Sequence, residues 1–594
     1  MTAARDARRL RPGVAVTPLR AGLHLRGRAG SVTLEGSAAL PALWQWVEGP
    51  LRAGALDDHL DAAAAGPALR TAVETLLGQL DAHGLLVSEP DGYADQRHDP
   101  VALWLGAAAE RPAAALAALG AARAEVLAGD PGGPLARAAG RALELAGVPV
   151  TRTADPALPE GRVLLHLHGT GPVRALAAGL RPDGGYATAP GSPARARADA
   201  AALETRLDAG RNPGEGDTGS GAEGPGGVGG EAPGEGGAGA GPVLAPLLGG
   251  AAAHRLLCAA AGLPDPAGEG GDERLLPGLP AVLLAEAAPL RAEYRTWPGP
   301  RLPAPDRGPG LAPAATLGEA LRRLSALTDE RCGALPAPLA AGLRQLPAPL
   351  AACELPGDGP VRRRLTAGAP RLDLARLELL CRAAELLLPA PGGTVGANPG
   401  HARGRALRAA FARRAARTPG GIPGAVDAAG PEWSGHPQFR HWWHTLTARL
   451  EVPARIRVRR AGAHGVHHAV VRRAGDAGVL GEAVEATAAD AAAFAALAAV
   501  AAVQAGGPGD GLPSGGAVAP LAAAGARAAG WEDDGWTGRW LAGTAEREAA
   551  FQEALRRLTG PPRHTAAGAP ARDGELPELL RAFGFTVLYT PEEP

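Results

Sequence analysis

The sequence predicts an α+β multidomain protein. Its 594 residues exceed the roughly 100 to 200 residues of a typical domain. Apolar residues recur at strand and helix periods over most of the chain, and two stretches poor in apolar residues interrupt them. We expect three domains: a small module of strands and helices at 1–92, an α/β domain at 93–300 and a mixed α/β domain at 301–594.

Two breaks in composition support this division. Residues 205–241 are dominated by Gly, Glu and Pro and cannot bury apolar surface, so we expect a disordered insertion there. Residues 297–315 hold enough proline to stop helices and central strands, which predicts a semi-rigid linker.

The first ninety residues show the clearest periods. Three short strands are predicted by apolar residues that alternate with polar ones: Val14 and Val16, Leu23 and Leu25, Val32 and Leu34. Three helices follow, with Ser37 as the expected N-cap of the first. The second lies around 56–63, and the third ends at Gly84.

Strands and helices alternate in the next two hundred residues. We expect strands at 124–129 and 162–169 and helices at 134–147 and 171–180, which together predict a parallel sheet. After the insertion comes an apolar helix, and then a further strand from about 281.

The second half of the chain is predicted to be mixed. The expected elements are helices near 316–328, 371–388, 401–416 and 482–505, and strands at 455–460 and 466–473.

Composition excludes several function classes. The net charge of -1 gives no overall attraction to nucleic acid or to an anionic membrane. All 60 basic residues are arginine, so no P-loop or Schiff-base lysine exists. The four cysteines show no CxxC spacing, the N-terminus lacks a signal-like apolar segment, and the longest apolar run is too short to cross a bilayer. We expect a cytoplasmic protein that neither contacts nucleic acid nor enters a membrane.

Residues 12–88 resemble the winged-helix-like recognition element of ribosomal-peptide maturation systems. The resemblance rests on three strands, the turn LEGSAALPALW at 34–44 and the closing LLGQLDAHGLL at 76–86. Members of this family bind the leader of a precursor peptide as an added strand beside their third strand. The resemblance therefore implies a binding edge at 31–36 and a groove wall from the helix at 68–81. The implied leader-binding residues are Ser31, Val32, Thr33, Leu34, Glu35, Leu69, Arg70, Val73 and Leu77.

Residues 93–300 resemble the Rossmann-like, E1-type (ocin-ThiF-like) domain fused behind that element in thiazole/oxazole peptide clusters, notably thiopeptide clusters. The resemblance is carried by residues 129–150, 241–266 and 279–300. Where adenylating members have GxGxxG, this chain has GDPGGP, and Pro131 and Pro134 remove two main-chain donors. The adenylation and zinc features of the family are both missing, so the resemblance implies a scaffold that binds no cofactor.

The second half has a fainter resemblance to YcaO enzymes, at 315–335 and 401–416. In that register Ala409 and Ala412 stand where the family places magnesium- and ATP-binding glutamates, and Arg413 keeps the arginine. Alanine offers no oxygen ligand to Mg²⁺. The resemblance implies an ATP site that no longer works.

Two other patterns were weighed against simpler interpretations. A metal site is conceivable among His436, His441, His444, His464, His467 and His468, but no cysteine or organised acidic partner lies at ligand spacing, so we expect surface or core histidines and no metal. WEDDGW at 531–536 is interpreted as a turn with a solvated acidic face rather than as catalytic carboxylates.

The leading hypothesis is a non-catalytic partner protein. It would bind the leader of a precursor peptide and deliver the core to a separate YcaO cyclodehydratase that forms azolines, the precursors of thiazoles and oxazoles. A flavin-dependent azoline dehydrogenase and a second copy of the chain are further candidate partners. Two alternatives stay open: an ATP-dependent cyclodehydratase in its own right, and a winged-helix DNA-binding regulator. Glu74 and Asp81 on the third predicted helix weigh against the regulator, because phosphate contacts need a basic face.

Overall fold

The computed structural model describes residues 7–28, 30–89, 99–209, 241–299, 310–339, 343–355, 363–389, 391–417, 425–462, 465–475, 478–506, 515–524, 535–559 and 575–589. They form two compact units. Unit 1 comprises Met1–Ala200, Pro225–Asp272 and Ala281–Tyr294; unit 2 comprises Ala201–Gly224, Glu273–Pro280 and Arg295–Pro594. Helices and sheets are present in both, so the predicted α+β multidomain class is confirmed.

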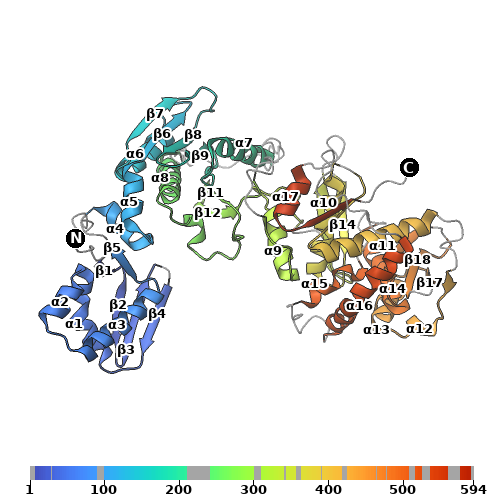
Figure 1. The fold of residues 1–594 in the computed structure, drawn as a ribbon. Helices are drawn as coiled ribbons and strands as arrows, with labels where there is room; N and C mark the ends of the chain where they lie inside the picture. The colour runs from blue at the N-terminus through green and yellow to red at the C-terminus, as the bar shows by residue number, and fades with distance from the viewer. Residues whose placement is uncertain are drawn as a thin grey trace, which may run out of the picture. The chain divides into compact units, whose positions relative to one another are not determined.

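The N-terminal module of unit 1 has the predicted order of strands followed by helices (Figure 1). Its elements are β1 (Ala7–Leu10), β2 (Ala15–Leu19), β3 (Gly22–Gly27), β4 (Gly30–Glu35), α1 (Leu40–Ala53), α2 (Leu56–Ala62), α3 (Pro67–Ala82) and β5 (Leu86–Glu89). The helix α3 ends as expected, because Gly84 adopts φ +63° and Leu85 N–H donates to Leu80 O. Ser37 does not cap α1: its hydroxyl accepts from Ala39 N–H, and the helix begins at Leu40.

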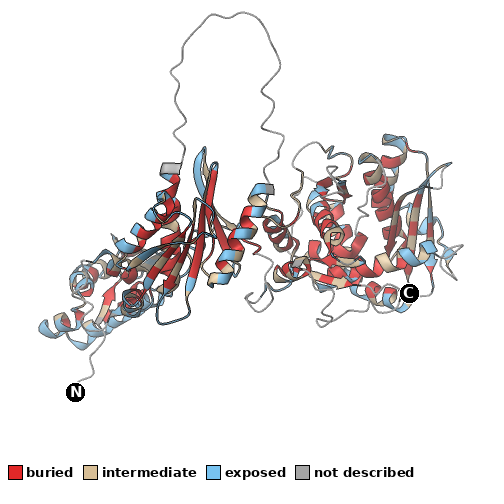
Figure 2. Cartoon of the chain, turned by 90° about the horizontal axis from the view of Figure 1, so that it is seen from above, coloured by how far each residue is buried: buried red, intermediate tan, exposed pale blue. Residues whose placement is uncertain are grey.

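A seven-stranded sheet forms the centre of the rest of unit 1. Its strands, from edge to edge, are β12 (Leu290–Thr296), β11 (Ala281–Ala287), β10 (Gly184–Ala187), β9 (Arg174–Arg181), β8 (Arg162–His168), β6 (Arg123–Ala128) and β7 (Val150–Ala154). The helices are α4 (Pro100–Ala108), α5 (Pro112–Gly120), α6 (Pro134–Leu145), α8 (Gly241–Ala260) and α7 (Pro193–Ala209), of which the residues from Ala201 on are assigned to unit 2. Figure 2 shows that buried residues lie along the strands and on one side of many helices.

The predicted parallel sheet is wrong. Only β6 and β7 pair in parallel, joined by the crossover helix α6, whereas β8, β9, β10 and β11 pair antiparallel with their neighbours. The segment 171–180, predicted to be a helix, contributes most of β9. Ala and Leu favour helices when isolated, but β9 is buried between two strands, and its pairing overrides that preference. Short connections join β8 to β9 and β9 to β10, so the chain cannot make the crossovers that parallel pairing of these strands needs.

Helix α8 packs in the interior of unit 1. Val243–Ala260 has a mean hydropathy of 1.5, and 56% of it is buried. By length and composition alone it is the one described helix that could cross a membrane. It carries Arg255, whose guanidinium is fully buried and donates to Asp265 Oδ2 at 2.6 Å and to Ala187 O, Thr188 O and Ala281 O. These contacts tie the helix to the sheet and are typical of a core helix.

The ends of the predicted disordered insertion at 205–241 are helical. Residues 205–209 belong to the last turns of α7, and α8 begins at Gly241. The remaining residues of the prediction, 210–240, lie outside the described part of the chain.

Unit 2 contains three small sheets and a set of helices around them. Its sheets are β13 (Leu350–Leu355) with β14 (Arg363–Gly368), β15 (Gly393–Gly396) with β20 (Thr586–Tyr589), and β16 (Val426–Asp427), β17 (Ala454–Ala461), β18 (Val466–Arg473) and β19 (Val479–Glu485) in that order. Its longer helices are α9 (Leu317–Leu327), α10 (Leu372–Leu387), α11 (Pro399–Arg417), α13 (Pro437–His444), α14 (Ala488–Gln504), α16 (Trp536–Thr559) and α17 (Glu575–Ala582), and its short ones are α12 (Pro431–Ser434) and α15 (Ala519–Ala523).

Five of the six elements predicted for this half lie within two residues of their predicted bounds, and the other elements were not predicted. One prediction, the helix at 482–505, is wrong at its start, because β19 runs to Glu485 and α14 begins only at Ala488. Thr487 separates the two elements: its side chain accepts from Asp490 N–H and caps the helix.

All four cysteines are buried and free. Burial raises the pKa of the thiols, to about 11 for Cys258 and Cys353. They are therefore unreactive core residues.

The contact between β19 and α14 leaves no room for a side chain at Gly481. A Cβ atom there would lie against Ala495 O and Ala499 N of the helix. We expect Gly481→Ala to lower the free energy of unfolding by about 1 to 3 kcal/mol, because rigid main chain must move. Gly318→Ala in α9, where a Cβ meets nothing within 4 Å, is the control and should be neutral or stabilising by up to about 1 kcal/mol. Thermal unfolding midpoints test the pair, and equal midpoints would contradict the packing described.

Candidate functional site

The strand β4 forms one edge of the three-stranded sheet β2-β3-β4. It pairs antiparallel with β3 from Gly22↔Glu35 to Gly27↔Gly30, and no other described strand pairs with it. Figure 1 places β4 at the outside of this sheet. Within the part of the chain that the structure describes, one side of β4 therefore has no main-chain partner.

The register decides which groups face outward. Gly36 N–H donates to Ala21 O, which makes 36 and 21 a hydrogen-bonded pair. In an antiparallel ladder the main-chain groups of alternate residues turn to the same side. Val32 and Leu34 therefore bond to β3, and the N–H and C=O groups of Ser31, Thr33 and Glu35 point away from the sheet.

The opposite edge of the sheet is less suitable for pairing. β2 pairs with β3 in the register Thr17↔His24 and Pro18↔Leu23. Since the main chain of Leu23 faces β4, that of His24 faces β2, and the outward positions of β2 are Val16 and Pro18. Pro18 has no N–H, so it removes a donor from this edge and blunts it. Only β4 offers donors at every outward position.

Of the other residues that the resemblance implies for leader binding, some are partly exposed and some are buried in the core. Leu69 is half-buried and, like Val32 and Leu34, packs against the core of the module. Val73 and Leu77 are members of that core, each 1% exposed. Arg70 bonds to Asp61 Oδ1 at 2.7 Å and to Ala65 O. The structure thus brings Val32, Leu34, Leu69, Val73 and Leu77 into one cluster and holds Arg70 against α2.

In the loop between β6 and α6, main-chain N–H groups donate to acceptors of the same loop. Gly132 N–H donates to Asp130 Oδ1 at 2.8 Å, and Gly133 N–H donates to Asp130 O at 3.0 Å. Pro131 and Pro134 have no N–H to offer. A phosphate would find few free main-chain donors at this turn, although it opens a helix.

The face of α11 where the YcaO resemblance would place magnesium ligands carries no carboxylate. Ala409 and Ala412 are half-buried, and the pKa of Arg413 is lowered by burial and by Arg417 and Arg382. Glu385, which attracts Arg413 weakly, is bonded to Arg405 at 2.8 Å. The face is therefore arginine-rich, which disfavours a bound cation.

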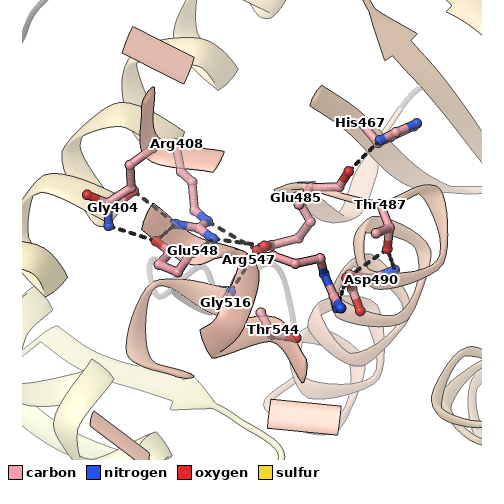
Figure 3. A network of polar contacts seen from close by, with 12 residues as sticks. Gly404, Arg408, His467, Glu485, Thr487, Asp490, Gly516, Thr544, Arg547 and Glu548 are labelled. Atoms are coloured by element: carbon pink, nitrogen blue, oxygen red, sulfur yellow. Dashed lines mark hydrogen bonds and ion pairs between the residues drawn. The ribbon is translucent and has the colours of Figure 1, made fainter. Parts of the chain in front are cut away.

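A buried ion network joins α11, β19 and α16 (Figure 3). Arg408 lies between two carboxylates, with Nη2 2.8 Å from Glu485 Oε2 and Nη1 2.7 Å from Glu548 Oε1. Gly516 N–H also donates to Glu485, at 2.7 Å. A Cβ at Gly404 would lie 2.7 Å from Glu548 Oε1, so the close approach of α11 and α16 needs glycine there.

This network has one more carboxylate than guanidinium. Burial, opposed by Arg408 and assisted by Glu548, raises the pKa of Glu485 to about 7. The contacts are all internal to the protein, so the network can fix the helices in place but has no free group for catalysis. The sequence did not predict this network, because Glu485 and Glu548 lie 77 and 140 positions after Arg408 in the chain.

A cavity of about 830 Å³ lies beside the network in unit 2. Its polar lining residues are Asn398, His401, Arg403, Glu548, Gln552, Glu553 and Arg556. Most of these are engaged: Gln552 donates to Gly400 O and Glu548, and Glu553 pairs with Arg556. Burial lowers the pKa of His401, which stays neutral.

The histidines singled out from the sequence do not gather into a metal site among the described residues, and His464 lies outside them, as does most of the 531–536 turn. His467 bonds to Ala486 O and His468 to Glu482. The group of ligands that the structure does bring together is Glu125, His166 and His168. The sequence analysis missed it, although HLH at 166–168 places two histidines on one face of a predicted strand.

Comparisons with known proteins leave the family open. No family model matches the chain, and no curated protein matches it. Two solved structures align with 98% of this chain and 94% of their own: one is described as a heterocyclase in complex with substrate and cofactor, the other as the heterocyclase TruD. Each has 12% sequence identity and a TM-score of 0.42, a likeness too low to establish a shared fold. The class that the fold itself defines is an α+β multidomain protein.

Glu485 gives unit 2 a specific dependence on pH. A carboxyl whose pKa is raised in the folded state contributes stability that is complete below its unfolded pKa, near 4.5, and is lost as the pH rises through about 7. We expect wild type to lose on the order of 2 to 3 kcal/mol over this range relative to Glu485→Gln, whose side chain cannot ionise and keeps one of the two oxygens that accept from Arg408. Thermal unfolding from pH 4.5 to 8 measures the difference. The exposed Glu546→Gln on α16 is the control and should follow wild type; a Glu485→Gln profile parallel to wild type would show that Glu485 does not titrate there.

Proposed function

We propose that this chain binds the leader of a ribosomally made precursor peptide and delivers its core to a separate YcaO cyclodehydratase. The observation that carries the proposal is the edge of β4. Three consecutive outward positions, Ser31, Thr33 and Glu35, offer main-chain donors and acceptors to an extended peptide. Added-strand binding draws its affinity from such groups and its register from side-chain pockets.

The side chains beside this edge support the same proposal. Val32, Leu34 and Leu69 are half-buried and apolar, so they provide surface on which alternate side chains of a leader would pack. Val73 and Leu77 support that surface from inside the core and need not touch the peptide.

A non-catalytic role is supported by two places where a nucleotide or its magnesium ion would otherwise bind. In the 129–134 turn, main-chain N–H groups already donate to Asp130. The α11 face at Ala409 and Ala412 has arginines where Mg²⁺ would need oxygen ligands. A subunit of this kind acts by raising the effective concentration of the core peptide at the partner's active site.

One of the two alternatives has an observation in its favour, and the other has an observation against it. The cavity beside Glu548 leaves room for a small ligand and keeps an independent cyclodehydratase in consideration. A DNA-binding module would need a basic α3, but Glu74 is on this helix and pairs with Arg8 at 2.7 Å, so the helix presents little net positive charge.

Thr33→Pro tests the binding edge. The substitution removes one outward N–H and leaves the ladder to β3 intact, and proline is tolerated on edge strands. With the fluorescently labelled leader of a candidate precursor peptide, we expect the affinity to fall about tenfold or more. Thr33→Val keeps the N–H and is the matched control. Anisotropy titrations that give equal affinities for Thr33→Pro and wild type would reject the β4 edge.

The assignment of catalysis to another polypeptide has its own test. The full chain with ATP and the same precursor should release phosphate only at background rate, and adding the YcaO enzyme should start turnover. A phosphate-release assay measures both. Precursor-dependent turnover by the chain alone would replace the scaffold proposal with the enzyme alternative.

A further inference from the structure

Two histidines and a glutamate stand together on one face of the seven-stranded sheet. Strands β6 and β8 are antiparallel neighbours, and their register sets Glu125 directly opposite His166. His168 lies two residues further along β8, so its side chain projects from the same face. The other face of these strands, with Val126 and Leu165, is buried in the core, which makes the platform under the three side chains rigid.

The spacing of the three side chains matches that of ligands around one ion. One ligand atom from each residue lies within 4.8 Å of the other two, and His166 Nδ1 lies 3.7 Å from Glu125 Oε2. Two ligands bound at about 2.0 to 2.1 Å on a tetrahedral Zn²⁺ are separated by roughly 3.4 Å. Small rotations of the side chains therefore complete the arrangement, without movement of the strands.

The His166 ring is not satisfied by the protein. Its side chain is 12% exposed, the separation from Glu125 is too long for a hydrogen bond, and Nε2 is buried without a hydrogen-bond partner among the described residues. Nδ1, which lies on the side of Glu125, is the nitrogen placed to bind an ion.

The surroundings allow an ion to enter and remain. His168 is exposed, and the Glu125 side chain is 35% exposed, so solvent reaches the group. Arg197 is directed to Asp155, 3.4 Å away, which offsets part of its repulsion. Arg123, opposite His168 in the register, is exposed and so is screened by water.

We propose that Glu125, His166 and His168 bind a divalent transition-metal ion of the zinc class. Imidazole nitrogen and carboxylate oxygen suit Zn²⁺ and its neighbours, and two histidines with one glutamate leave a fourth position for water or for a ligand from outside. The site does not depend on peptide binding at β4, because it uses none of the residues of that edge.

The experiment uses the full chain, stripped with a chelator, and Zn²⁺ alone as the probe. Competition against a chromophoric chelator gives the affinity and the number of ions bound. We expect one site that is weakened at least about tenfold by His168→Ala and by Glu125→Gln. His83→Ala, which removes an exposed histidine of the N-terminal module, is the matched control and should leave that site unchanged.

Co²⁺ provides a second measurement that does not depend on affinity. A cobalt ion held by two imidazoles and a carboxylate in four-coordinate geometry has intense visible absorption, which should be present in wild type and in His83→Ala and lost in His168→Ala. Because His168 is exposed, this variant should keep the unfolding midpoint of stripped wild type. Equal Zn²⁺ affinity and an unchanged Co²⁺ spectrum in His168→Ala and Glu125→Gln would overturn the proposal.

Discussion

The alternation of main-chain hydrogen bonds in the β2-β3-β4 sheet is the constraint on which the candidate binding edge depends. Once Gly36 bonds to Ala21, every second residue of β4 must turn its N–H and C=O to the outside. The same alternation, carried through β3, places Pro18 at an outward position of β2. One edge is therefore rich in donors and the other is blunted, which gives the small sheet a single favoured side for pairing.

Each unit contains a buried arginine whose charge is compensated inside the protein, unlike the surface salt bridges elsewhere on the chain. Arg255 in unit 1 and Arg408 in unit 2 are both buried, and each is surrounded by acceptors that use its planar fork of donors. In a chain without lysine, arginine is the side chain that carries a positive charge at every physiological pH. Such networks fix the relative positions of the elements within each unit, and they offer no free group to a substrate.

The proposed peptide site and the proposed metal site in unit 1 recognise their ligands through different groups. The β4 edge recognises main chain, so its specificity comes from the few apolar side chains next to it. The Glu125, His166 and His168 group recognises an ion through side-chain atoms held on paired strands. Both depend on strand register, because a slip of one residue would turn every side chain and every main-chain donor to the opposite side.

The sequence by itself determined the local elements whose signal is carried by neighbouring residues. The strands β2, β3 and β4, the helices α1, α2 and α3, the end of α3 at Gly84 and the extent of α9, α10, β17 and β18 follow from apolar periods and from glycine. Only the tertiary structure decided what depends on residues far apart: that 174–181 is a strand, that the large sheet is mainly antiparallel, that Arg408 meets Glu485 and Glu548, and that Glu125 faces His166. The physical reason is that burial and pairing between distant segments outweigh local propensity. A local sequence pattern does not show which distant segment will pack or pair with it.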